Sequence, residues 1–175
     1  VLDEPVEILG GPAAELLISS DRPVAQLAVR LCDVAPNGES ARVTYGVLNL
    51  THRNGHDAVY PLVPGERIRV TVPLDDIGYV FPQGHRIRLA ISTCYWPMLW
   101  PSPEHVTLNI IAGDSRLILP ERPRQADEIT PAFGPAVTAP PLKLETSRSS
   151  DSKRTITTDV ETGRTEIRIV DDFGK

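Results

Sequence analysis

The sequence predicts an all-β protein, and three observations support this prediction. About ten short segments have the alternation or the apolar runs of β-strands, and turn residues separate them at spacings of roughly 8–12 residues. No stretch long enough for a helix shows helical periodicity. Seventeen of the 175 residues are proline, about twice the usual ~5%, and proline is excluded from helix interiors and central strand positions. Such a chain folds as an antiparallel β-sandwich or barrel.

Each expected strand ends at residues that favour a turn. Asn37-Gly38 supplies the positive φ that a tight hairpin needs, and Gly46 is the expected site of a β-bulge. The expected strands are, in chain order, residues 4–11, 13–19, 26–34, 41–50, 66–74, 81–92, 105–112, 116–119, 155–160 and 164–170.

The stretch 81–92, FPQGHRIRLAIS, shows the strand pattern most clearly. A Pro/Gly turn leads into a segment in which apolar side chains alternate with other side chains, so one face is expected to be buried and the other exposed. Ile87, Leu89 and Ile91 form the first set, and Arg86, Arg88 and Ala90 the second.

We expect one domain over residues 1–175, a length that buries a sizeable core. Within it, residues 120–154 read as a Pro-rich and polar surface connection, and residues 155–172 as a terminal hairpin. From both ends of the sequence, we expect this chain to be a fragment of a longer polypeptide. The given sequence shows no transmembrane run and no signal peptide, which favours a cytoplasmic location and no membrane partner.

Charge argues against a nucleic-acid partner. The formal net charge is −5 at pH 7, and lysines and arginines are scattered along the sequence, whereas nucleic-acid-binding domains usually carry a basic patch. Two cysteines, Cys32 and Cys94, could form one disulfide, but in strand contexts free thiols are favoured.

Candidate catalytic and metal residues are few, and we expect no catalytic, metal or cofactor site. No G-x-S-x-G motif is present, so a triad would lack its usual scaffold. His52 and His56 are spaced for metal binding only on a helix, and Asn54-Gly55 between them forces a turn, so solvated loop histidines are favoured over ligands with Asp57. His85 is favoured as a structural hydrogen-bonding residue rather than a base.

The aromatic loop, residues 95–103, is the most distinctive candidate for a binding surface. Tyr95, Trp96 and Trp100 are half of the six Trp and Tyr residues. Three interpretations remain open. The rings could cap the core, or they could contact a partner domain together with Met98. They could also stack on sugars beside Glu104 and Asn109, which would make the chain a carbohydrate-binding module. Self-association through strand edges or this loop, giving a homodimer, is a further alternative.

Several segments in the right order resemble one known family. Residues 2–10, LDEPVEILG, with Ser19-Ser20-Asp21, resemble the start of the C-terminal domain of X-Pro dipeptidyl-peptidases and cocaine-esterase-type (CocE/NonD) serine hydrolases. Residues 29–38 are similar to that family's paired strand and hairpin. The stretch 81–92 resembles its most recognisable signature, with Phe81, Gly84, His85 and Arg86 as the structural signature residues, and Tyr95-Trp96-Pro97 follows. The resemblance runs from about residue 2 to 120 and resumes weakly at 155–172.

The resemblance implies a jelly-roll, galactose-binding-like sandwich that follows an α/β-hydrolase domain with an inserted helical cap. No triad residue of that family maps onto this sequence, so the resemblance implies a non-catalytic domain. Its partners would be the upstream hydrolase and cap domains. Tyr95, Trp96, Met98 and Trp100 would lie on that contact. The family module continues beyond the position of Lys175, so final strands are expected to be missing.

Overall fold

The computed structural model describes residues 1–123, 131–140, 145 and 147–174, and it confirms the all-β prediction. Among these residues, eleven strands and two short 3-10 helices, η1 (Leu50–His52) and η2 (Ala112–Asp114), are present. The strands are β1 (Val6–Gly10), β2 (Ala13–Ser20), β3 (Gln26–Val34), β4 (Ser40–Asn49), β5 (Ile68–Pro73), β6 (Ile77–Phe81), β7 (Arg86–Ser92), β8 (Leu108–Ile110), β9 (Arg116–Ile118), β10 (Asp151–Thr158) and β11 (Thr165–Asp172).

The chain divides into two compact units, Val1–Ile129 and Thr130–Lys175. The first contains β1 to β9, and the second contains the hairpin of β10 and β11. One domain over residues 1–175 stays a prediction. In the structure, the contacts divide between these two units. Strand β10 begins at Asp151, inside the range 120–154 that was expected to be a connection. Residues 124–130, 141–144 and 146 of that range lie outside the described residues.

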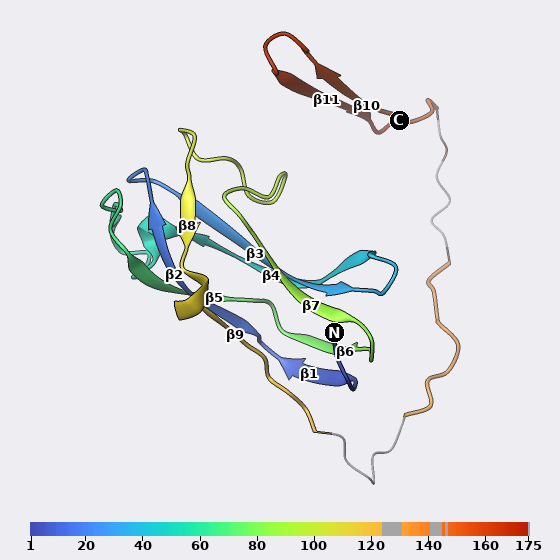
Figure 1. Ribbon diagram of the computed structural model, residues 1–175. Helices are drawn as coiled ribbons and strands as arrows, with labels where there is room; N and C mark the ends of the chain where they lie inside the picture. Colours follow the sequence, from blue (N-terminus) through green and yellow to red (C-terminus); the bar gives the residue numbers. More distant parts are fainter. Residues whose placement is uncertain (124–130, 141–144, 146, 175) are drawn as a thin grey trace. The chain divides into compact units, whose positions relative to one another are not determined.

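The first unit contains two larger antiparallel sheets and a two-stranded sheet of β1 and β6 (Figure 1). In one sheet β2 is central: it pairs with β5 along one edge and with β8 and β9, one after the other, along the opposite edge. In the other sheet β3 is central, between β4 and β7. The sandwich is thus confirmed, whereas the jelly-roll and galactose-binding-like classification stays a prediction.

The core lies between the two larger sheets, because each central strand points a row of large apolar side chains toward the other sheet. On β2, Leu16 and Ile18 are buried, and on β3, Leu27, Val29 and Leu31 are buried. Alternate residues of a strand share a face, so these two rows meet between the sheets. As predicted for 81–92, the apolar residues of β7 pack against this core, namely Ile87, Leu89 and Ile91.

The expected bulge at Gly46 is wrong. Gly46 pairs regularly with Val29, and the register shift lies instead between Leu31 and Cys32. A Cβ atom at Gly46 would lie 2.0 Å from the carbonyl oxygen of Pro73. The glycine is therefore required because the backbones of β4 and the end of β5 approach each other closely.

The stretch 81–92 contains the end of one strand and all of another. Phe81 closes β6, which pairs with β1, and the turn after it leads into β7. Strand β1 is also paired on its other side, where Leu9 N donates to the Pro120 carbonyl (3.0 Å) and Arg122 N to the Glu7 carbonyl (2.8 Å). The start of the expected connection is thereby fixed to the edge of the sandwich.

Candidate docking surface

The loop between β7 and β8 is closed by its own backbone. Tyr95 N donates to the Leu99 carbonyl, and Leu99 N donates to the Tyr95 carbonyl, both at 2.8 Å. The Trp96–Pro97 peptide inside this turn is cis. At the exit from β7, the Ser92 hydroxyl donates to the Cys94 carbonyl (2.7 Å). The loop therefore leaves the sheet as a defined projection.

Tyr95 anchors this projection to the outer face of the β4-β3-β7 sheet. The guanidinium of Arg30 lies 4.7 Å from the centre of the Tyr95 ring, and Arg42 Nη1 donates to the Tyr95 hydroxyl (2.6 Å). Arg42 also lies over the ring of Tyr45, 5.0 Å from its centre. Cations over aromatic faces are attracted by the ring quadrupole. Tyr95 is thus a supporting residue, held between two arginines.

The other three residues predicted for an interdomain contact point outward. Trp96 is 44% exposed, Met98 47% and Trp100 65%. The two indole rings pack on each other, with centroids 4.4 Å apart and planes inclined by 60°. The interpretation that the tryptophans cap the core is therefore wrong. We name Trp96, Met98 and Trp100 the aromatic tip.

The arrangement does not form the flat platform that sugar stacking needs. The Trp96 and Trp100 planes are steeply inclined, and the Tyr95 ring is covered by the Arg30 guanidinium. Glu104, the acidic candidate beside the loop, is ion-paired with Arg22 (3.1 Å). The three rings named for a carbohydrate site are thus divided between a support and an exposed tip.

Sequence reasoning missed a basic face beside the aromatic tip. Arg42 and Arg88 are both opposite Cys32 in the sheet, and Arg86 is opposite Val34. Cross-strand neighbours and alternate residues share a face, so these arginines lie with Arg30 on the outer side. None of them is ion-paired with a carboxylate within the described residues. We name Arg30, Arg42, Arg86 and Arg88 the arginine face.

The expected signature residues build the turn next to this face. Phe81 is fully buried and meets the Tyr79 ring edge-on at 5.0 Å. Gly84 adopts φ +83°, in the left-handed region that favours glycine. Its N–H donates to the Leu2 carbonyl (2.9 Å), while Leu2 N donates to the His85 carbonyl (2.8 Å). The turn therefore binds the N-terminal segment.

A buried carboxylate organises the same turn. Asp33, on β3, accepts a hydrogen bond from the Tyr79 hydroxyl (3.0 Å), and its other oxygen lies 2.8 Å from His85 Nδ1. Burial, and then the hydrogen bond and charge of Asp33, raise the pKa of Tyr79 above its ordinary value of 10.0. In the described part of the chain no hydroxyl or thiol bonds to the second nitrogen of His85.

The remaining candidates do not assemble into a site. The rings of His52 and His56 lie 5.5 Å apart in the loop after β4. Among the described residues, no group of three or more His, Cys, Asp or Glu could hold a metal ion. Cys32 and Cys94 are free, as expected.

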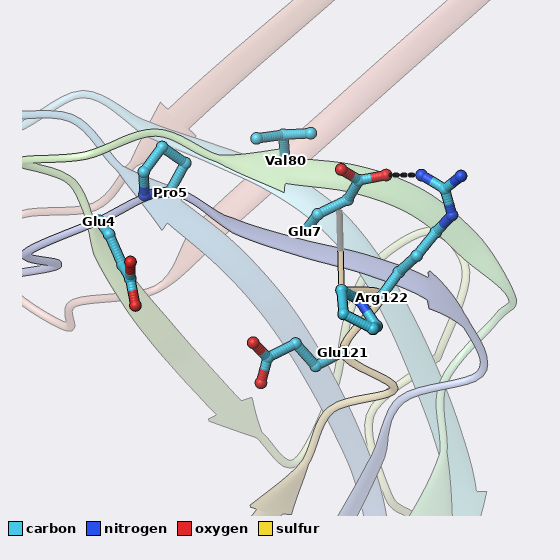
Figure 2. A pocket seen from close by; sticks show the side chains of 7 residues that line it. Glu4, Pro5, Glu7, Val80, Glu121 and Arg122 are labelled. Atoms are coloured by element: carbon cyan, nitrogen blue, oxygen red, sulfur yellow. Dashed lines mark hydrogen bonds and ion pairs between the residues drawn. The ribbon is translucent and has the colours of Figure 1, made fainter. Parts of the chain in front are cut away.

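A shallow hollow of about 300 Å³ lies where β1 meets the segment after β9 (Figure 2). Three carboxylates line it, from Glu4, Glu7 and Glu121, and Glu7 is ion-paired with Arg122. Of the described residues that line the hollow, none has a histidine or hydroxyl side chain. This ion pair reinforces the backbone bond between the same two residues.

No helix within the described ranges is both long and apolar enough to span a membrane.

Comparison with known proteins gives the relatives of this chain. The family model of the X-Pro dipeptidyl-peptidase C-terminal non-catalytic domain matches residues 1–133. A Mycobacterium bovis protein named "Putative serine esterase Mb1866c" is 36% identical over 108 residues, covering 52% of this chain and 17% of that protein. Cocaine esterase of a Rhodococcus species is 29% identical over 97 residues, covering 55% and 17%. The chain thus spans 17% of the length of these curated relatives.

Solved structures with the same fold belong to larger hydrolases. An α-amino acid ester hydrolase matches with a TM-score of 0.65 and 20% identity, over 69% of this chain and 24% of that chain. A CocE/NonD family hydrolase from Staphylococcus aureus matches with a TM-score of 0.59 and 18% identity, over 70% and 29%. At these identities the likeness establishes the fold, and the sequence match establishes the family. This chain belongs to the X-Pro dipeptidyl-peptidase C-terminal non-catalytic domain family.

Proposed function

We propose that this chain is the non-catalytic sandwich of a serine hydrolase acting on esters, amides or X-Pro peptides, and that it binds the catalytic and cap domains of the same polypeptide. The observation that carries the proposal is the aromatic tip, which is exposed yet held in place by Tyr95 on the arginine face. Family membership supplies the type of parent enzyme.

The chemistry of this surface suits a protein partner. Trp, Tyr, Met and Arg are the residues enriched at the centres of protein interfaces. The backbone bonds within the loop and the Arg42–Tyr95 hydrogen bond hold the tip in one conformation before binding, so less side-chain freedom is lost on association. Within the described residues, the arginine face has no carboxylate partner, and its charge favours a partner surface that carries carboxylates.

The chain itself is proposed to have no hydrolase activity. The His85–Asp33 pair lacks a nucleophile among the described residues, and Asp33 also binds Tyr79. Purified chain should therefore give no turnover of p-nitrophenyl esters or X-Pro p-nitroanilides. Turnover that a serine-directed inhibitor abolishes would contradict this part of the proposal.

The test of docking uses a polypeptide in which the hydrolase and cap domains precede this chain. Replacing Trp96 and Trp100 together by Ala should lower the temperature at which hydrolase activity is lost, because the catalytic domain loses its contact with the aromatic tip. The matched control is Val59→Ala, which trims another exposed apolar side chain. Equal inactivation temperatures for all three proteins would refute docking through this tip.

Calorimetric titration of the chain with a panel of sugars separates the alternative function. Sugar binding that is lost in Trp96→Ala or Trp100→Ala would assign the aromatic tip to a carbohydrate-binding module. Absence of binding, together with the shift in inactivation temperature, supports the interdomain role.

A further inference from the structure

The arginine face divides into two pairs of residues with different surroundings. Arg30 donates to the Ser92 hydroxyl (3.3 Å) and lies over the Tyr95 ring. Arg42 donates to the Tyr95 hydroxyl, and its Nη1 also lies 3.9 Å from the Met98 sulfur. These two arginines therefore support the aromatic tip with their guanidinium groups.

Arg86 and Arg88, both on β7, have no such role. Within the described residues, neither side chain makes a hydrogen bond, an ion pair or a cation–π contact. Guanidinium groups carry five N–H donors in a fixed planar arrangement. The donors of these two residues therefore await a partner that the described part of the chain does not supply.

The sheet beneath these two arginines indicates how their side chains lie. Arg88 is opposite Cys32 and Arg86 is opposite Val34, and directly paired residues share a face of the sheet. Cys32 and Val34 are nevertheless only 8% and 1% exposed. Neighbouring side chains must cover them, and the arginines directly opposite provide long apolar stems for this. The stems are thus packed, and the charged groups lie at their ends.

The pairing of the strands also fixes the spacing of the charges. Residues two apart on one strand lie about 7 Å apart, and residues on the two strands that flank a third lie about 10 Å apart. Arg86 and Arg88 have the first spacing, and Arg42 and Arg88, on either side of Cys32, have the second. Like charges at these distances repel each other. The approach of carboxylates to this face therefore relieves a repulsion that the sheet itself leaves uncompensated.

The charge of the whole chain selects among anionic partners. The formal net charge is −5, so a polyanion such as a nucleic acid is repelled by the chain at long range. A carboxylate on a protein surface is a short-range partner, and its plane matches a guanidinium group through two parallel hydrogen bonds. The arginine face adjoins the aromatic tip, because Arg42 contacts both Tyr95 and Met98. A protein that covers the tip is therefore placed to supply the carboxylates.

We propose that Arg86 and Arg88 bind two carboxylates on the catalytic or cap domain of the same polypeptide and so fix the orientation in which the aromatic tip docks. The inference rests on the proposed docking function and adds the charge of the partner surface to it. The tip alone is a single point of contact and leaves rotation about it free, whereas two charge pairs beside it do not. Positions i and i+2 of a strand, or i and i+4 of a helix, have the spacing that matches the two arginines.

The test uses the polypeptide in which the hydrolase and cap domains precede this chain. Replacing Arg86 and Arg88 together by Gln should lower the temperature at which hydrolase activity is lost by about 2 °C or more, and replacing both by Lys should lower it less. The difference between wild type and the Gln variant should shrink between about 50 mM and about 500 mM NaCl, because salt screens the charge pairs. The matched control replaces Arg67 and Arg69 by Gln, two arginines at the same spacing at the start of β5 in the other sheet. This control should keep the wild-type inactivation temperature.

Thermal unfolding of this chain alone separates docking from a structural role. The Gln variant of Arg86 and Arg88 should melt at the wild-type temperature or above it, because neutralisation removes repulsion within the arginine face. A lower melting temperature would mean that the two arginines pair with carboxylates of this chain, those of β10 and β11 included, and would overturn the proposal.

The variant Trp96→Ala with Trp100→Ala distinguishes failure of this inference from failure of the proposed function. If the tryptophan variant lowers the inactivation temperature of the long polypeptide and the arginine variant does not, docking through the tip stands and the inference fails. If only the arginine variant lowers it, the charge contact stands and docking through the tip fails. If neither variant lowers it, both are refuted.

Discussion

His85 Nδ1 lies 2.8 Å from Oδ1 of Asp33, and this contact joins the turn before β7 to the inner side of β3. The same turn binds Leu2 through two backbone hydrogen bonds. Asp33 is 5% exposed, so its charge depends on partners from the protein rather than on water. The position of the N-terminal segment therefore depends on one buried carboxylate.

Asp33→Ala should destabilise the chain. It removes the acceptor of Tyr79 and the partner of His85, and hydrogen bonds to a charged group contribute about 1.5–3 kcal/mol each. We expect the free energy of unfolding, measured with urea, to fall by about 2–4 kcal/mol. Asp33→Asn should lose less, and the exposed substitution Glu39→Gln should have little effect. A loss in Asp33→Ala no larger than that in Glu39→Gln would show that the network does not hold the turn.

Alkaline pH should destabilise the chain through Tyr79. Its pKa is raised in the folded state, first by burial and then by Asp33. The folded state therefore holds the hydroxyl proton when the unfolded state has already lost it, and stability falls as pH rises above about 10. Below pH 10 this contribution is fully present.

Urea midpoints between pH 8 and pH 11 test this. Tyr79→Phe should be less stable than wild type at pH 8, since Asp33 loses a donor, and its midpoint should fall less steeply above pH 10. Tyr60→Phe, outside the Asp33 network, should keep the wild-type slope. Identical slopes in wild type and Tyr79→Phe would argue against the role of this residue.

Gly46→Ala should destabilise the sandwich, because its Cβ would lie 2.0 Å from the Pro73 carbonyl oxygen. The strands must separate to admit the methyl group, and forcing extra atoms into a packed site typically costs about 1–3 kcal/mol. Gly113→Ala is the matched control, since its Cβ would meet nothing within 4 Å. Thermal unfolding of the two variants makes the comparison, and equal melting temperatures would exclude the close approach of β4 and β5.

The indole pair of the aromatic tip should give an exciton couplet in the far-UV circular dichroism spectrum, because the Trp96 and Trp100 centroids lie 4.4 Å apart. Trp96→Phe and Trp100→Phe should each abolish the couplet with little change in melting temperature, since both rings are exposed. Tyr95→Ala should weaken the couplet although it leaves both tryptophans present, because it removes the support from Arg30 and Arg42. A couplet that persists in either tryptophan variant would contradict this geometry.

Strands and turns could be predicted because their signals are local. Alternation along 81–92 correctly assigned Ile87, Leu89 and Ile91 to the core. Asn37-Gly38 correctly predicted the β3–β4 hairpin, where Gly38 has φ +91°. Gly46 was misjudged because a glycine in a strand can mark either a bulge or a close contact, and the contact is with Pro73, which is far away in the sequence.

The sequence by itself determined the all-β class, the inward side of the stretch 81–92, the family and the presence of an aromatic loop. Only the tertiary structure decided that Tyr95 supports the loop while Trp96 and Trp100 project from it. It alone brought Arg30, Arg42 and Arg88 to one face and Asp33 to His85. The physical reason is that alternation fixes the side of a strand to which a residue points, whereas pairing between distant strands fixes its neighbours.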